Sequence, residues 1–298
     1  MGRLVEGHWH DEWYDTESTG GAFKREDAGF REQVGEGMRH PPESGRYHLY
    51  VSLACPWAHR TLIMRKLKGL EQHIDVTVSH PHMLEGGWRY DPPEPLYGFA
   101  HHHQLYTRDK PNYTGRVTVP VLWDKQTESI VNNESAEILR IFNSAFNTLT
   151  GNTDDYYPEL LREEIDRINE RVYHDINNGV YKAGFATKQQ AYEKACLALF
   201  AALDWVEELL ATRRYLTGER ITEADWRLFT TLVRFDPVYH GHFKCNIRRI
   251  QDYPHLSGYL RELYQWSGIA ETVSFDHIKQ HYYYSHDTIN PTRIVPLG

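Results

Sequence analysis

A β-rich stretch runs directly into a helix-forming segment at Cys55, and this junction constrains the fold more than any other feature. Arg46–Ser52 has the composition of a strand, and Pro56–Gly69 predicts a helix that begins with proline and closes with glycine. Cys55 is therefore expected at a helix N-terminus, where unpaired backbone N–H groups and the helix dipole favour a thiolate over a thiol. We interpret Cys55 as a reactive cysteine.

The segments after this junction predict a thioredoxin-like sheet. Ile74–Ser79 alternates as a half-buried strand does, and two more strands are predicted at Val117–Asp124 and Glu128–Val131. A helix then opens at Asn132 and runs to about Phe146. The order βαβ…ββα is that of a thioredoxin-like domain.

Two features between these strands need explanation. Pro120 stands inside a strand-like run, which is anomalous for a central strand, and a cis Val119–Pro120 peptide would resolve the anomaly. Residues 80–113 predict a long loop without secondary structure, and such insertions are usually functional.

After Gly151 the pattern becomes helical. Apolar spacing and capping signals predict four helices: Pro158–Asn177, Ala186–Thr212, one started by the capping box Thr222–Asp225 before Trp226, and one from Pro254 through Trp266. The tail, His281–Gly298, ends in a proline-punctuated loop.

These patterns predict an α/β plus all-α protein in three parts. Residues 1–45 form an irregular N-terminal arm, residues 46–150 the thioredoxin-like domain and residues 151–298 an all-helical domain with a C-terminal tail. Four aromatic residues are expected to pin the arm to the body of the protein: Trp9, Trp13, Phe23 and Phe30.

Composition excludes several classes of function. The 298-residue chain has a net charge of −8 and no basic stripe, which argues against a nucleic-acid partner. The N-terminal sequence lacks the apolar core of a signal peptide, and the longest apolar run, Ala195–Leu203, is too short to span a membrane. The three cysteines are few and far apart, so we expect a reducing compartment, the cytoplasm.

The other cysteines and the histidine-rich segments are not predicted to have a catalytic or metal-binding role. Cys196 and Cys245 are predicted to be inert packing residues of the helical domain. His101–His103 has no partners at metal-ligand spacing, so we expect a solvated loop there and no bound metal. His59 and Arg60 either strengthen the positive field at Cys55 or lie on the helix surface, and both roles stay open.

The residues around Cys55 point to an external thiol. Residue 58 is Ala58, so no Cys-x-x-Cys disulfide can form, and an oxidised Cys55 must pair with another molecule. Glu134 and Ser135 at a helix start either hold a zwitterionic amino-acid head or simply cap the helix. With the Val119 backbone presented to an extended peptide, the layout suits a tripeptide thiol, glutathione.

Several strings, in order along the chain, resemble one family. They are Cys55–Arg60 (CPWAHR), Thr118–Asp124 (TVPVLWD), Asn132–Ile138 (NNESAEI), Asn178–Ala186 (NGVYKAGFA), Arg234–Tyr239 (RFD-x-VY) and Ile278–Pro291 (IK-x-HYY-x-SH-x-x-INP). Together they resemble the glutathionyl-hydroquinone reductases, the xi class of glutathione transferases.

The resemblance implies roles for individual residues. Cys55 matches the catalytic nucleophile. Five residues match glutathione-binding positions: Trp88, Arg116, Val119, Glu134 and Ser135. Tyr181 and one tyrosine of the pair Tyr282–Tyr283, for which we prefer Tyr282, match tyrosines of the hydroquinone pocket, and Tyr239 is a weaker candidate. The resemblance assigns glutathione binding to the thioredoxin-like domain and the hydroquinone pocket to the C-terminal part, and it implies a homodimer.

The implied activity is reduction of glutathionyl-hydroquinones, with glutathione as co-substrate and a Cys55–glutathione mixed disulfide as intermediate. Two alternatives stay open. One is an omega-like thioltransferase or dehydroascorbate reductase, and the other is a non-enzymatic glutathione-transferase-like module that mediates protein contacts.

Overall fold

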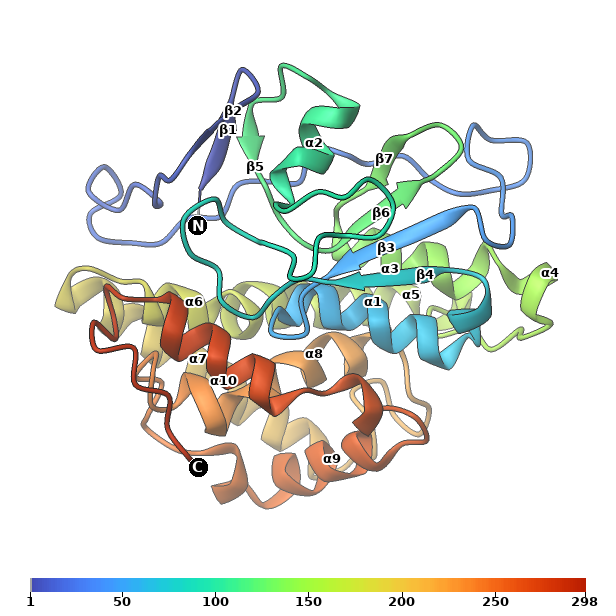
Figure 1. Cartoon of the computed structure of the whole chain (residues 1–298). Helices are drawn as coiled ribbons and strands as arrows, with labels where there is room; N and C mark the ends of the chain where they lie inside the picture. Colours follow the sequence, from blue (N-terminus) through green and yellow to red (C-terminus); the bar gives the residue numbers. More distant parts are fainter. Residues whose placement is uncertain (1) are drawn as a thin grey trace. The chain divides into compact units, whose positions relative to one another are not determined.

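The computed structural model of the chain describes residues 2–298, drawn with their element labels in Figure 1. Internal contacts divide the chain into two compact units. The first unit comprises the segment that ends at Trp13, Glu26–Asp154 and Thr272–Ser285. The second unit comprises Tyr14–Arg25, Asp155–Glu271 and His286–Gly298.

The first unit contains all the strands found in residues 2–298. They are β1 (Arg3–Val5), β2 (His8–His10), β3 (Tyr47–Val51), β4 (Asp75–Val78), β5 (Gly115–Arg116), β6 (Val121–Asp124) and β7 (Ser129–Asn132). Its helices are α1 (Pro56–Leu67), the 3-10 turn η1 (Leu70–Gln72), α2 (His103–Asp109), α3 (Ser135–Ser144), α4 (Asn147–Thr150) and α10 (Phe275–Ser285).

The central sheet confirms the predicted thioredoxin-like order. Its strands lie in the order β4-β3-β6-β7, with β3 parallel to β4 and the other two pairs antiparallel. Helices α1 and α3 pack against each other on one face, and α2 lies over the other face (Figure 1). Strand β3 is buried along its whole length, which accounts for its continuous apolar and aromatic sequence.

The face of the sheet under α2 carries an aromatic core. Because side chains alternate along a strand, Tyr50 of β3 and Val121 and Trp123 of β6 point to the same side. Leu105 and Tyr106 of α2 pack into this cluster from above. The α2 helix corrects the prediction that residues 80–113 lack secondary structure; its seven residues are too few to show a helical period.

Residues 3–10 also differ from the predicted irregular arm. Strands β1 and β2 form a hairpin, and β1 pairs with β5 in a second, three-stranded sheet. The turn residues Glu6 and Gly7 both have positive φ, as a two-residue hairpin turn requires. Strands of three residues are too short to show the alternation on which strand prediction depends.

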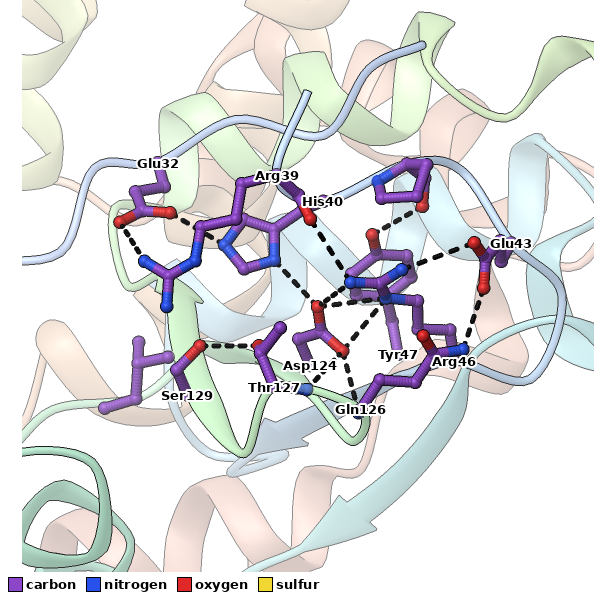
Figure 2. Close-up of polar contacts among 12 residues, drawn as sticks. Glu32, Arg39, His40, Glu43, Arg46, Tyr47, Asp124, Gln126, Thr127 and Ser129 are labelled. Atoms are coloured by element: carbon purple, nitrogen blue, oxygen red, sulfur yellow. Dashed lines mark hydrogen bonds and ion pairs between the residues drawn. The ribbon is translucent and has the colours of Figure 1, made fainter. Parts of the chain in front are cut away.

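A buried carboxylate attaches the later part of the arm to the sheet, as Figure 2 shows. Asp124 at the end of β6 is fully buried and accepts hydrogen bonds from Arg46 Nη2 at 2.6 Å and from the Gln126 N–H at 2.9 Å. His40 lies between Asp124 Oδ2 and Glu32 Oε2, at 2.7 Å from each. Burial alone would raise the pKa of Asp124, but the bonds from Arg46 and His40 hold it at about 2.

The second unit is helical. Its elements are the 3-10 turn η2 (Glu159–Leu161), α5 (Arg162–Arg171), the π-helix η3 (Val172–Asn177), α6 (Gly179–Gly184), α7 (Gln189–Leu210), α8 (Glu223–Arg234), the π-helix η4 (Phe235–Tyr239), the 3-10 turn η5 (Ile250–Asp252) and α9 (Pro254–Gln265). A last 3-10 turn, η6 (Ala270–Thr272), runs from this unit into the first.

The predicted capping box at α8 is confirmed, because the Thr222 N–H donates to Asp225 Oδ2 at 2.8 Å and the Thr222 side chain caps in return. The four predicted helices correspond to η2 through η3, α7, α8 and α9. Helix α6, which carries Tyr181, lies between the first two predicted helices, where no element is predicted. Helix α10 reaches five residues into the segment expected as a tail.

The two units are not continuous along the chain, whereas the predicted division at 1–45, 46–150 and 151–298 is linear. Residues 272–285 group with the first unit because α10 contacts the loop after β4. His281 Nδ1 lies 3.0 Å from the Pro81 carbonyl oxygen, and the ring of His82 stacks on Tyr284 at 3.9 Å. Residues 14–25 group with the second unit, where the Thr187 N–H donates to the Gly21 carbonyl.

Candidate active site

Cys55 lies where β3 gives way to α1. It is the N-cap residue, with φ −75° and ψ 120°, and Pro56 follows at the first helical position. The side chain is half-buried, and its thiol forms no disulfide with Cys196 or Cys245. Its Sγ lies 3.6 Å from the carbonyl oxygen of Val119. The predicted position at a helix N-terminus is thus confirmed, and the helix dipole is directed at the sulfur.

Val119 precedes a cis peptide bond, as the sequence predicted. The Val119–Pro120 bond is cis, and β6 begins only at Val121. Pro120 therefore stands before the central strand rather than inside it, which removes the anomaly of a proline in a strand. A second cis bond, Asp91–Pro92, was not predicted.

Glu134 and Ser135 open α3. Glu134 is the N-cap residue, and its Oε1 accepts a hydrogen bond from the Ala136 N–H at 3.0 Å. Helix capping, one of the two roles left open, is therefore present. Ser135 Oγ lies 3.5 Å from Glu134 Oε1 and 3.5 Å from Nη1 of Arg60.

Arg60 and His59 are both buried, so the alternative that they lie on the helix surface is wrong. The Arg60 guanidinium lies over the Trp57 ring at 4.6 Å and reaches Ser135 from α1. His59 Nε2 lies 2.7 Å from Thr272 Oγ1. Sequence reasoning did not identify Arg60 as a neighbour of Ser135, because no local pattern reports a contact 75 residues apart.

Trp88 and Arg116 come from loop and edge segments. Trp88 is buried, and its ring stacks on His281 of α10 at 4.8 Å. Arg116 donates from Nη1 to the Glu12 carbonyl at 2.6 Å, and its Nε lies 3.3 Å from Glu26. Both residues are in the first unit with Cys55.

Of the tyrosine pair on α10, Tyr282 is the more buried, with 1% of its surface exposed, whereas Tyr283 is half-buried. Tyr282 packs edge-on against His281, with ring centroids 5.2 Å apart. Tyr282 therefore shares the first unit with Cys55 and Trp88.

Tyr181 and Tyr239 lie in the second unit, in an aromatic cluster. The ring of Tyr181 is 6.1 Å from Tyr239 and 5.6 Å from Phe243, and Tyr239 stacks on Phe243 at 5.4 Å. The Arg25 guanidinium lies over the Tyr181 ring at 5.1 Å. Phe243 and Arg25 were not among the predicted residues; only the fold brings them to Tyr181.

The remaining cysteines are buried in the second unit, in accordance with the expected packing role. Burial raises the pKa of the Cys196 thiol, and it raises the pKa of Cys245 further, since that side chain is fully buried. Neither thiol has the half-exposed helix N-terminus that Cys55 has.

The His101–His103 segment is not the expected solvated loop. His102 is fully buried, and burial lowers its pKa to about 4. Within residues 2–298, no cluster of three or more His, Cys, Asp or Glu side chains is arranged to hold a metal ion. In the same residues, no helix combines the length and apolar character needed to cross a bilayer.

Comparison with known proteins agrees with this architecture. Residues 54–145 match the family model described as the glutathione S-transferase N-terminal domain. Residues 189–262 match the model of the glutathione S-transferase C-terminal domain. The two matches fall on the sheet-bearing first unit and the helical second unit, respectively.

The chain is 56% identical to the glutathionyl-hydroquinone reductase YqjG of Escherichia coli, covering 100% of this chain and 95% of that protein. It is 54% identical to the glutathionyl-hydroquinone reductase PcpF of Sphingobium chlorophenolicum, covering 100% and 96%. Among solved structures, glutathione-bound YqjG from E. coli matches with a TM-score of 0.90 and 52% identity, covering 100% of this chain and 95% of that one. The chain therefore belongs to the glutathionyl-hydroquinone reductases, the xi class of the glutathione transferases.

Proposed function

We propose that this protein reduces glutathionyl-hydroquinones to hydroquinones with glutathione as co-substrate. The observation that carries the proposal is the half-buried Cys55 thiol at the start of α1, 3.6 Å from the carbonyl that precedes a cis-proline. A nucleophilic thiol beside the Val119 backbone suits attack on a sulfur held by a peptide. The membership in the reductase family supports the same substrate class.

Glutathione would lie along the residues that surround Cys55. In this proposal the Val119 backbone pairs with the cysteinyl residue of the tripeptide, as an added strand pairs with a sheet edge. Ser135 and the first N–H groups of α3 receive the γ-glutamyl carboxylate, and Glu134 meets its ammonium. Trp88 and Arg116 complete the contacts that the resemblance implies.

The reaction then proceeds in two steps, in each of which a thiolate attacks a sulfur atom. The Cys55 thiolate attacks the sulfur of the glutathionyl-hydroquinone; an S–S bond forms, the S–C(aryl) bond breaks, and the ring carbon takes the electron pair and a proton. A second glutathione thiolate attacks the glutathione sulfur of the mixed disulfide, which releases glutathione disulfide and restores the Cys55 thiolate. Overall, the aryl carbon is reduced by two electrons, and the thioether sulfur and the thiol of the second glutathione are oxidised to a disulfide.

Tyr181 and Tyr282 are proposed on the hydroquinone side, where a phenolic hydroxyl orients the ring or supplies the proton. Each role rests on the resemblance. Substituting phenylalanine for either tyrosine tests it, since the hydroxyl is lost while the ring remains. We expect a lower kcat with glutathionyl-menadione and an unchanged rate of Cys55 alkylation by iodoacetamide.

Mass spectrometry after a single turnover tests the covalent mechanism. The protein, mixed with one equivalent of glutathionyl-menadiol (the hydroquinone form) and no free glutathione, should gain one glutathione on the peptide that contains Cys55. Added glutathione should remove the adduct. An unmodified Cys55 in a protein that has released menadiol would refute the mechanism.

Substrate comparison separates this activity from the related ones. We expect turnover of glutathionyl-menadione to exceed that of dehydroascorbate by a wide margin; equal or reversed rates would favour an omega-like thioltransferase. A binding module would keep its function in the Cys55→Ser variant, whereas a reductase loses turnover.

We further propose a cytoplasmic homodimer, on the basis of the cysteine usage and the resemblance. Size-exclusion chromatography with light scattering measures the assembly, and a monomeric mass would contradict it.

A further inference from the structure

A buried tyrosine hydroxyl joins two main-chain segments of the first unit. Tyr106 of α2 has no exposed surface. Its hydroxyl donates to the Thr118 carbonyl oxygen at 2.9 Å, and it accepts from the Thr118 N–H and from Asn133 Nδ2, each at 3.2 Å. A hydroxyl has one hydrogen to donate and two lone pairs, so these three bonds use its full capacity.

On one side, the hydroxyl fixes the residue before Val119. The Thr118 carbonyl also lies 3.0 Å from Nε2 of His102, whose Nδ1 lies 2.6 Å from the hydroxyl of Tyr90. Because a carbonyl only accepts, Nε2 carries the proton and Tyr90 donates to Nδ1. Tyr106 of α2 and His102, just before α2, thus bind both main-chain polar groups of Thr118. Thr118 directly precedes Val119, whose backbone we assign to the cysteinyl part of glutathione.

On the other side, the hydroxyl fixes the residue before Glu134. The Asn133 amide donates to Tyr106, and its Oδ1 accepts from the Phe30 N–H at 3.0 Å. Asn133 is itself 6% exposed, so these bonds are made away from bulk water. Asn133 directly precedes the N-cap of α3, the segment that we assign to the γ-glutamyl head.

We propose that Tyr106 is a positioning residue that sets the separation between the two parts of the glutathione site. Its hydroxyl touches no substrate atom; it ties Thr118 to Asn133, one residue before each binding segment. Without it, the half-buried Thr118 N–H and the buried Asn133 amide each lose a hydrogen-bond acceptor, and the segments can move apart. This inference rests on the proposed function, because it assumes that both segments hold one tripeptide.

The Tyr106→Phe variant tests the proposal. S-methylglutathione is the probe, since its blocked thiol binds without reacting, and calorimetry gives Kd. We expect Kd to rise about 10-fold, as loss of one to two buried hydrogen bonds implies. KM for glutathione should rise by a similar factor, while the rate at which iodoacetamide alkylates Cys55 stays within about twofold, because the start of α1 is unchanged.

Tyr47→Phe is the matched control. Tyr47 of β3 is equally buried in the same unit and donates one hydrogen bond, to the Pro41 carbonyl at 2.6 Å. This variant should lose some stability, through its single hydrogen bond, and keep the Kd of the wild type within about twofold. Equal Kd values for the two variants would overturn the role of Tyr106. A wild-type protein that binds no S-methylglutathione would instead overturn the proposed function.

A second variant keeps the proposal testable if Tyr106→Phe is poorly folded. Asn133→Ala removes the amide that the hydroxyl holds, and Kd should again rise severalfold. In the double variant, the loss of affinity should be smaller than the product of the two single losses, since both remove the same bond. An unchanged Kd for Asn133→Ala, or fully multiplicative losses, would contradict the shared role.

Discussion

The first unit, which contains Cys55, and the second unit, which contains Tyr181, are stabilised by different kinds of contact. In the first unit, buried polar groups hold the backbone: the Tyr106 hydroxyl bonds to both main-chain polar groups of Thr118, and Asp124 accepts a hydrogen bond from the Gln126 N–H. In the second unit, the rings of Tyr181 and its neighbours pack on one another. The contrast teaches that the first unit keeps backbone donors and acceptors in place, whereas the second provides apolar ring surface.

The largest expected effect separates the cysteines of the two units. Cys55→Ser should lower kcat for glutathionyl-menadione by at least about 10³-fold, because a hydroxyl is a far weaker nucleophile near neutral pH. Cys245→Ser should lower the melting temperature, since it buries a hydroxyl, but change kcat less than about twofold. Steady-state kinetics on both variants, with circular dichroism to verify folding, makes the comparison. Comparable losses of kcat in the two variants would contradict the assignment of Cys55 as catalytic and Cys245 as structural.

The next effect concerns the buried carboxylate of the first unit. Asp124→Asn should lower the free energy of unfolding by about 3 kcal/mol, because buried Arg46 and His40 then lose their shared buried carboxylate, and Arg46 is left with its ion pair to the exposed Glu43. Asp75→Asn is the control, since the ion pair of Asp75 with Lys125 is exposed and should be worth less than about 1 kcal/mol. Urea unfolding measures both; similar losses would show that burial of Asp124 does not matter.

A smaller effect is expected from close packing in the second unit. Gly184 of α6 lies against the fully buried ring of Phe243, and an added methyl group would overlap that ring. Gly184→Ala should therefore cost about 2 kcal/mol. Gly258 of α9 has open space around its Cα, so Gly258→Ala should stabilise by about 0.5 kcal/mol. If both substitutions stabilise the protein, the Phe243 ring must move at little cost to make room for the added methyl group.

The smallest effect is a pH dependence from the first unit. His102 has a folded-state pKa of about 4, lowered by burial from 6.5, so the unfolded chain binds more protons between these values. Stability from this histidine is present above pH 6.5 and is lost as the pH falls towards 4. From pH 7.5 to 5.5 the loss is about 1 kcal/mol. In urea titrations at the two pH values, the free energy of unfolding of His102→Gln should fall by about 1 kcal/mol less than that of the wild type. An identical pH dependence of the two proteins would exclude His102 as the source.

Local features of the sequence predicted the centre of the first unit well. The junction at Cys55, the order of the four central strands and the cis bond before Pro120 are all confirmed. Each depends on a few adjacent residues whose conformational limits are strong. The same holds for the capping box at Thr222.

Short elements could not be predicted in this way. Strands β1 and β2, helix α2 and helix α6 have at most seven residues each, so none completes enough periods to stand out. Their stability comes from partners far along the chain. Leu105 and Tyr106 of α2, for example, form part of the core over the central sheet.

By itself, the sequence determined the family, the reactive cysteine and the frame of the sheet, because turns, caps and alternation are encoded within a few residues. Tertiary structure alone decided that Tyr106 joins Thr118 to Asn133, that Arg60 reaches Ser135, and that α10 packs with the first unit. Those contacts join residues 12 to 200 positions apart. A hydroxyl or guanidinium selects its partner from whatever the folded chain brings within about 3 Å, and no local pattern records that choice.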